Sequence, residues 1–317
     1  MRPSAILRLL AVGLASLWLA ACTAPDTAYD KLEAKYASPA SRYMDLPGGL
    51  RVHYRDQGPR NAPTLVLVHG FSASLHAWEP WVQRLSGDYR IVSLDLPGHG
   101  LTRAPDDYAP STDNSVAVVD QLATRLDLPP FVLGGNSMGG GVAWNYALAH
   151  PDRLRGLVLV DAAGWPDPNR KSEGSPVVFK LLGNPVGRWF LRNADPGLFA
   201  EKGLKQAYLD ESLVTPELVT RYVELARAPG HRAILTGGRG GPQRPVTPDT
   251  FKAIHTPTLV MTGEQDALIP AASARGLAAA IPGAKLIAYP GVGHVPMEQI
   301  PDRSAADLKA WLATLPE

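Results

Sequence analysis

The sequence has little cysteine, little net charge and no apolar run long enough to span a membrane comfortably. Its 317 residues include one cysteine, so a disulfide bond within one chain is excluded. The 31 basic and 30 acidic side chains nearly cancel, which leaves no electrostatic case for a nucleic-acid partner. The eight histidines are scattered without the spacing of a zinc site, and we expect no metal and no cofactor. The 45% of hydrophobic residues nevertheless suffices for a sizeable core.

The N-terminal segment has the form of a secretory signal. Arg2 and Arg8 provide a basic start, and the apolar run from Leu9 to Leu19 is too short for a typical membrane span. The run ends in LAAC, which resembles the processing site of a bacterial lipoprotein signal. Through that resemblance we expect residues 1–21 to be removed and Cys22 to be lipidated as the new N-terminus.

The protein is then expected to be exported and held by acyl chains on a bacterial membrane, at the periplasmic face or at the outer membrane. A plain secretory signal with an incidental cysteine is the alternative. Residues 22–40 are polar with a short helical stretch at their centre, and we interpret them as a tether to the lipid surface. The domain itself begins near Ser41.

Buried strands alternate with helices from Ser41 onward, which indicates an α/β fold with a mostly parallel sheet covered by helices on both faces. A hairpin is expected first, turning at Gly48-Gly49. The segments that contain a continuous apolar strand are 64–70, 90–100, 130–137, 154–164, 256–266 and 284–294. The pattern breaks between residues 165 and 250, where no such strand occurs. We expect a core of residues 41–164 and 251–317 with an inserted segment at 165–250.

The motif Gly135-Asn136-Ser137-Met138-Gly139 fits G-x-S-x-G and lies between a buried strand and a helix. In such a turn the serine has a strained backbone, and its hydroxyl is raised above the sheet at a helix N-terminus. The structural alternative is a glycine-rich corner between strand and helix, in which the serine has no catalytic role. The placement after a buried strand favours a nucleophile at Ser137.

A serine nucleophile needs a base and an acid that orients it. His294 follows a late strand in a loop rich in glycine and proline, and it is the predicted base. Asp266 follows the preceding strand and is the predicted acid, although Asp161 also ends a strand and remains open as an alternative. Surface, capping or turn roles are expected for the histidines at other positions, His53, His99, His150, His231 and His255. The oxyanion hole is expected from the backbone amides of Met138 and Phe71.

Five segments resemble the α/β-hydrolase superfamily in the right order. They are HGFSAS at 69–74, DLPGHGLT at 95–102, GNSMGG at 135–140, GEQDALIP at 263–270 and GVGHVPMEQIP at 291–301. The resemblance implies an α/β-hydrolase fold, with an eight-stranded, mostly parallel sheet flanked by helices and a helical cap inserted after the sixth strand. It also implies the triad Ser137, Asp266 and His294 with the oxyanion donors Phe71 and Met138.

The resemblance favours an esterase or lipase that cleaves a small-molecule carboxylic ester, a lipidic one being compatible with the membrane anchor. Superfamily members with an aspartate nucleophile are disfavoured by Ser137. A carbon–carbon bond hydrolase or a lactonase with the same triad is the alternative, as is a non-catalytic ligand-binding protein of this fold. The sequence carries no signal for the oligomeric state.

The substrate pocket is the least defined part of the prediction. His76, Trp78 and Trp165 are candidates for its lining. The inserted segment is rich in large apolar side chains, which either form an acyl-chain pocket or give the segment a small core of its own; they are Trp165, Phe179, Leu181, Trp189, Phe190 and Phe199.

Overall fold

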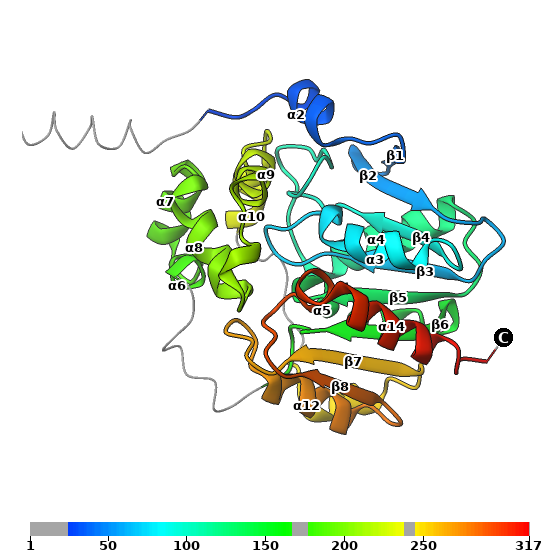
Figure 1. Cartoon of the computed structure of the whole chain (residues 1–317). Helices are drawn as coiled ribbons and strands as arrows, with labels where there is room; N and C mark the ends of the chain where they lie inside the picture. The colour runs from blue at the N-terminus through cyan, green and yellow to red at the C-terminus, as the bar shows by residue number, and fades with distance from the viewer. Residues whose placement is uncertain (1–24, 167–176, 238–244, 317) are drawn as a thin grey trace, which may run out of the picture.

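One sheet of eight strands forms the centre of the fold (Figure 1). The computed structural model describes residues 25–166, 177–237 and 245–316. The strand order is β1-β2-β4-β3-β5-β6-β7-β8. β1 and β2 form an antiparallel hairpin, β2 pairs antiparallel with β4, and all remaining pairs are parallel. The prediction of an α/β-hydrolase fold with an eight-stranded, mostly parallel sheet is confirmed.

The strands coincide closely with the apolar runs of the sequence. Their bounds are β1 Ser41–Leu46, β2 Leu50–Gln57, β3 Thr64–Val68, β4 Arg90–Leu94, β5 Phe131–Asn136, β6 Leu154–Val160, β7 Thr258–Gly263 and β8 Lys285–Tyr289. The hairpin turns at Gly48 and Gly49, whose φ angles of 78° and 76° require residues without a Cβ.

Two helical layers cover the sheet. One layer contains α4 (Thr112–Arg125), α5 (Met138–Ala149) and α12 (Ala271–Ala280), and the other contains α3 (Glu79–Leu85) and α14 (Pro301–Leu312). Successive strand residues alternate between the layers because side chains in a strand point to opposite faces. On β3, Val66 and Val68 pack with the first layer, while Leu65 and Leu67 pack with the second.

The segment between β6 and β7 forms a separate group of helices beside the sheet (Figure 1). Its described elements are α6 (Val177–Leu182), α7 (Pro185–Asn193), α8 (Gly197–Ala207), α9 (Pro216–Ala226) and α10 (His231–Thr236), followed by the short α11 (Pro248–Lys252). No strand lies among the described residues of this insertion. We call residues 177–237 the helical insertion.

The described part of the expected tether is folded against the domain. Residues Tyr29–Tyr36 form helix α2, whose Leu32 is 1% exposed and packs with Leu101 and Leu225. Lys35 forms an ion pair with Glu224 of α9 at 2.8 Å. The tether prediction is therefore wrong for residues 25–40, because the helix has an apolar side that contacts both the core and the helical insertion.

None of the helices in the described residues is long and apolar enough to cross a membrane. The expected signal segment and the predicted lipidation site Cys22 lie outside the described residues.

Candidate active site

Ser137 occupies a sharp turn between strand β5 and helix α5. Its φ of 55° and ψ of −117° lie in a region that costs a residue with a side chain about 1–3 kcal/mol. Two backbone hydrogen bonds hold the turn. The Ser137 amide donates to the carbonyl oxygen of Val160, and the Ala163 amide donates to the carbonyl oxygen of Ser137. Strain that the surrounding structure maintains in this way is typical of a functional residue.

The glycines around Ser137 allow very close packing. A Cβ on Gly135 would lie 2.2 Å from the carbonyl oxygen of Gly139, and one on Gly139 would lie 2.2 Å from that of Val68. A Cβ on Gly140 would lie 2.5 Å from the Ala162 side chain. These clashes explain the glycine-rich sequence, because strand, turn and helix approach each other at distances that no side chain permits.

His294 and Asp266 form a buried hydrogen-bonded pair. The distance between His294 Nδ1 and Asp266 Oδ2 is 2.6 Å. The other carboxylate oxygen, Oδ1, accepts hydrogen bonds from the backbone amides of Leu268 at 2.7 Å and Ile269 at 3.0 Å. Both oxygens are thereby oriented, and the pair has the geometry in which a carboxylate fixes an imidazole tautomer with Nε2 free to accept a proton.

Asn136 connects the serine turn with the histidine loop. Its side-chain amide donates to the carbonyl oxygens of His294 at 3.0 Å and Val160 at 3.2 Å. Within the described residues no hydrogen bond joins the Ser137 hydroxyl to His294, and in unliganded enzymes such contacts are often long. Asn136 is 3% exposed, and the sequence analysis missed its role because its partners are backbone carbonyl groups far away in the chain.

The His294 loop also contacts the helical insertion. The His294 amide donates to the carbonyl oxygen of Ala207, the last residue of α8, at 2.8 Å. A Cβ on Gly293 would lie 2.5 Å from that same oxygen, so only glycine fits before the histidine. The insertion therefore takes part in holding the histidine in place.

Asp161, the alternative acid, is fully buried beside this pair. Its Oδ1 accepts from the Thr262 hydroxyl at 2.7 Å and from the Gly263 amide at 3.1 Å. His294 makes its carboxylate hydrogen bond with Asp266 and not with Asp161. Oxygen or nitrogen atoms of Asp161, Asp266 and His294 lie within 4.8 Å of one another, a grouping of the kind that can also hold a metal ion.

The loop after β3 lies next to Ser137. A Cβ on Gly70 would lie 3.2 Å from the Cβ of Ser137, which brings the Phe71 segment beside the serine. His69 fixes this loop, since its Nδ1 donates to the carbonyl oxygen of Gly70 at 2.7 Å and its Nε2 accepts from the Leu96 amide at 3.0 Å. Burial lowers the pKa of His69, and this hydrogen-bond pattern requires the neutral ring.

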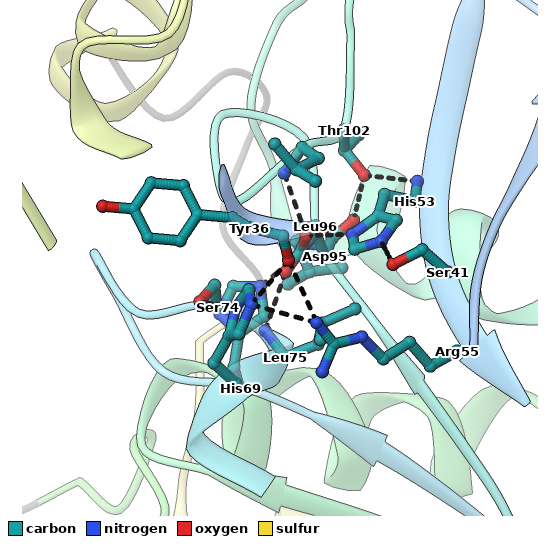
Figure 2. A network of polar contacts seen from close by, with 12 residues as sticks. Tyr36, Ser41, His53, Arg55, His69, Ser74, Leu75, Asp95, Leu96 and Thr102 are labelled. Atoms are coloured by element: carbon teal, nitrogen blue, oxygen red, sulfur yellow. Dashed lines mark hydrogen bonds and ion pairs between the residues drawn. The ribbon is translucent and has the colours of Figure 1, made fainter. Parts of the chain in front are cut away.

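A second Ser–His–Asp arrangement lies at the start of the domain (Figure 2). Ser41 Oγ is 2.8 Å from His53 Nε2, and His53 Nδ1 is 2.7 Å from Asp95 Oδ2. Asp95 also accepts from the backbone amides of Leu75 at 2.7 Å and Leu101 at 2.9 Å. Burial by itself would raise the pKa of Asp95. The hydrogen bond and the charge of His53 have the larger effect, so the pKa of Asp95 lies below its usual range. The arrangement joins β1 to β2, to the segment after β4 and to the segment after β3.

Two histidines of the sequence analysis are placed differently from the expectation. His53 is fully buried in this network, and His231 is 1% exposed, with Nδ1 at 2.9 Å from the carbonyl oxygen of Leu225 and Nε2 at 3.1 Å from that of Thr102. Both were assigned to surface or capping positions, which is wrong. Their polar partners come from distant segments that no local pattern identifies.

Two of the three pocket candidates, Trp78 and Trp165, pack against other aromatic side chains. Trp78 is fully buried and packs on Trp81 with a ring-centroid distance of 5.2 Å, so it belongs to the core. Trp165 packs against Phe251 at 5.6 Å and covers Gly276 of α12. These contacts of the two tryptophans are packing contacts, and neither of them involves Ser137.

His76 lines a different cleft. This cleft of about 620 Å³ lies between α2, α3 and α9, and Tyr36, Arg55 and Arg221 also line it. The lining of this cleft does not include Ser137, Asp266 or His294. The ring of His76 contacts Ser74 and Arg55, and burial lowers the pKa of His76 to about 4. The prediction of His76 at the substrate site is not supported by this placement.

The chain is similar in sequence to known hydrolases. The chain is 29% identical over 263 residues to the pimeloyl-[acyl-carrier protein] methyl ester esterase of Xanthomonas campestris, covering 81% of this chain and 97% of the esterase. It is 28% identical over 266 residues to the 2-hydroxy-6-oxo-2,4-heptadienoate hydrolase of Pseudomonas putida, covering 81% of this chain and 91% of that enzyme.

Among solved structures, a bacterial membrane phospholipase A superposes with a TM-score of 0.73 at 26% identity, covering 98% of this chain and 96% of the other. The relatives thus include an esterase, a carbon–carbon bond hydrolase and a phospholipase. A family model described as the alpha/beta hydrolase fold matches residues 63–299. With the sheet, the strained serine turn and the buried histidine–aspartate pair all inside that range, the chain belongs to the alpha/beta hydrolase family.

Proposed function

We propose that this protein is a serine hydrolase that cleaves carboxylic esters through an acyl-enzyme, with Ser137 as nucleophile, His294 as base and Asp266 as acid. The observation that carries the proposal is the buried His294–Asp266 hydrogen bond of 2.6 Å, on a loop tied through Asn136 to the strained Ser137 turn. An oriented histidine next to a serine on such a turn is the arrangement that activates a hydroxyl.

The reaction follows from these groups. His294 Nε2 takes the proton of Ser137 as Oγ attacks the ester carbonyl carbon, and Asp266 stabilises the imidazolium. The imidazolium then returns the proton to the departing alcohol. Water, deprotonated by the same histidine, attacks the acyl-enzyme and releases the acid.

The backbone amides of Met138 and Phe71 are the proposed donors to the oxyanion. Met138 is the first residue of α5, so its amide belongs to the helix N-terminus, where orphan donors and the helix dipole favour negative charge. Phe71 stands on the loop that His69 fixes beside Ser137. Losing one such donor typically costs about 10²–10³-fold in rate.

The chain offers a matched pair of variants for the test. Ser137→Ala should lower hydrolysis of p-nitrophenyl esters, from acetate to palmitate, by at least about 10³-fold and abolish labelling by a fluorophosphonate. Ser41→Ala removes the serine of the other Ser–His–Asp arrangement, which is bound by the Ser38 amide, and should keep activity within about 3-fold. Fluorophosphonate labelling that survives in Ser137→Ala would refute the assignment of Ser137 as the nucleophile.

The same assay separates the competing activities. Hydrolysis of esters with loss on Ser137→Ala supports the ester reading, and the preferred chain length reports the size of the acyl site. A protein that labels with the fluorophosphonate but cleaves only lactones or ring-fission diketones would favour the lactonase or carbon–carbon hydrolase alternative. A folded protein that neither labels nor hydrolyses would favour a ligand-binding role.

We further propose that the protein is exported and anchored to a bacterial membrane through lipidated Cys22. The support is the sequence alone, namely the basic start, the short apolar run and the LAAC ending. Cys22→Ser should abolish incorporation of fatty acid and leave the precursor uncleaved. Unchanged membrane attachment of that variant would contradict the anchor.

A further inference from the structure

Asp161 is a buried carboxyl group that the proposed mechanism does not use. It follows β6 with a φ of 44°, and its residue is 1% exposed. The acidic side chain of Asp266 and the phenol of Tyr289 on β8 are its electrostatic neighbours. An isolated carboxylate in such surroundings is costly unless hydrogen bonds compensate it.

The two oxygens of Asp161 have different surroundings. Oδ1 accepts two hydrogen bonds, from the Thr262 hydroxyl and the Gly263 amide. Oδ2 is buried and receives no hydrogen bond from any donor in the described residues. This asymmetry fits a neutral carboxylic acid, with Oδ1 as the carbonyl oxygen and Oδ2 as the hydroxyl that needs an acceptor.

Asp266 is the acceptor within reach. One oxygen of Asp161, one oxygen of Asp266 and one ring nitrogen of His294 lie within 4.8 Å of one another. Asp266 already accepts hydrogen bonds from the backbone amides of Leu268 and Ile269 and lies 2.6 Å from His294 Nδ1. Two carboxylates this close cannot both be ionised without a large repulsion, so the proton belongs on the oxygen that has no donor.

Resting on the proposed triad, we propose that Asp161 is a positioning residue that carries a proton on Oδ2 and donates it in a hydrogen bond to the Asp266 carboxylate. The chain of hydrogen bonds then runs from Asp161 to Asp266 to His294. The direction of the pKa supports this assignment: burial raises the pKa of Asp161 well above its usual range, and the charge of Asp266 adds to the rise.

The proton on Asp161 sets the charge that faces His294. With it, the two carboxyl groups carry one negative charge between them, and part of the Asp266 electron density is drawn toward Asp161. A doubly ionised pair would hold the proton on His294 too strongly for a base that must release it to the leaving alcohol. Asp161 thus adjusts the base without touching substrate.

Infrared difference spectroscopy on the full-length protein tests the proton directly. Wild type minus Asp161→Asn should contain the carbonyl band of a protonated carboxylic acid at pH 7. Thr262→Val should move that band to higher frequency, because Oδ1 loses its hydroxyl donor. The same spectra in the Ser137→Ala background should be unchanged, so the result does not depend on catalysis.

A pH–rate profile provides the second readout. Asp161→Asn retains an acceptor oxygen and a neutral donor, so the acidic limb of kcat/KM should stay within about 0.3 pH units of wild type. If Asp161 were ionised in the wild type, removal of its charge would move the midpoint of the acidic limb to lower pH by about one unit or more. Asp161→Ala, which lacks the donor, should shift the limb to higher pH.

Three results would overturn the proposal. The first is a carboxylate band in place of the acid band in the Asp161→Asn difference spectrum. The second is a downward shift of the acidic limb in that variant. The third is an acid band that appears only after a chelator is added, since a metal ion would then occupy the position of the proton. Failure of the proposed function can be distinguished from these results, because ester hydrolysis would then survive in Ser137→Ala.

Discussion

At the scale of single residues, the site depends on groups that hold the reacting side chains in place. Asn136 is the most informative of them, because it precedes Ser137 at the end of β5 and donates to the carbonyl oxygen of His294. Ser137 and His294 are 157 positions apart in the chain, and this amide is a direct link between their segments.

Asn136→Ala is expected to affect both stability and turnover. It removes the side-chain donor to the buried carbonyl oxygen of His294, while the Val160 oxygen keeps its bond from the Ser137 amide, and it should cost about 1–3 kcal/mol of the free energy of unfolding in urea. A displaced His294 loop should lower kcat by about 10–100-fold. Asn145→Ala removes a similar amide from the partly exposed side of α5 and serves as the control. Equal effects of the two variants would show that Asn136 has no special role.

At the scale of elements, the β5–turn–α5 unit depends on backbone contacts. The second residue of α5, Gly139, faces the end of β3, where the carbonyl oxygens of Val68 and His69 lie. This contact lets the helix N-terminus lie directly over the sheet edge, with the Ser137 turn between them. The helix further along has more room, since a Cβ on Gly141 would lie 3.5 Å from the carbonyl oxygen of Ala163 and 3.9 Å from its Cβ.

Two Gly→Ala substitutions in α5 should therefore have opposite effects. Gly139→Ala places a Cβ 2.2 Å from a backbone oxygen, and we expect about 2–4 kcal/mol of destabilisation with loss of ester hydrolysis. Gly141→Ala meets only ordinary contacts and should be neutral or stabilise by up to about 1 kcal/mol. Thermal unfolding followed by circular dichroism compares them. A Gly139→Ala protein as stable and active as wild type would contradict the packing argument.

At the scale of the whole molecule, the N-terminal segment, the core and the helical insertion meet in polar contacts. Thr27 donates through its amide to Arg227 of the insertion, and Arg103 of the core pairs with Glu33 of α2 at 2.7 Å. Glu298, on α13 (Pro296–Gln299) of the core, interacts with Tyr208 and Arg221 of the insertion. The buried Glu298 Oε1 has no partner among the described residues.

Glu298 should make the stability of the fold depend on pH. Burial raises its pKa to about 7, against about 4.3 in an unfolded chain. A carboxyl group with a raised pKa in the folded state stabilises fully below about pH 4.3, and this contribution is lost as the pH rises toward 7. Glu298→Gln should thus match wild type near pH 4 and exceed it by about 2–4 kcal/mol above pH 7.

Urea unfolding at pH 4.5, 6 and 8 measures this difference. Glu217→Gln, an exposed glutamate on α9, provides the control and should change stability by less than about 0.5 kcal/mol at each pH. A difference between Glu298→Gln and wild type that stays constant from pH 4.5 to 8 would show that Glu298 is ionised throughout.

The fold was predictable because its signals are local. Continuous apolar runs marked β3 to β8, the Gly48-Gly49 pair marked the hairpin, and the absence of such runs marked the insertion. Asp266 and His294 were found in the same way, as polar residues that follow consecutive strands of a parallel sheet. Such strands end at the same edge, so the residues after them come together.

The sequence by itself determined the strands, the serine turn and the histidine–aspartate pair, because each depends on residues within a few positions and on the order of the strands. Only the tertiary structure decided that residues 25–40 dock on the domain, that Trp78 is core, and that His53 is buried. It also decided that Asp161 lies beside Asp266. Those placements depend on contacts between segments tens to hundreds of residues apart, and the burial and charge of a side chain there are set by neighbours that no local pattern specifies.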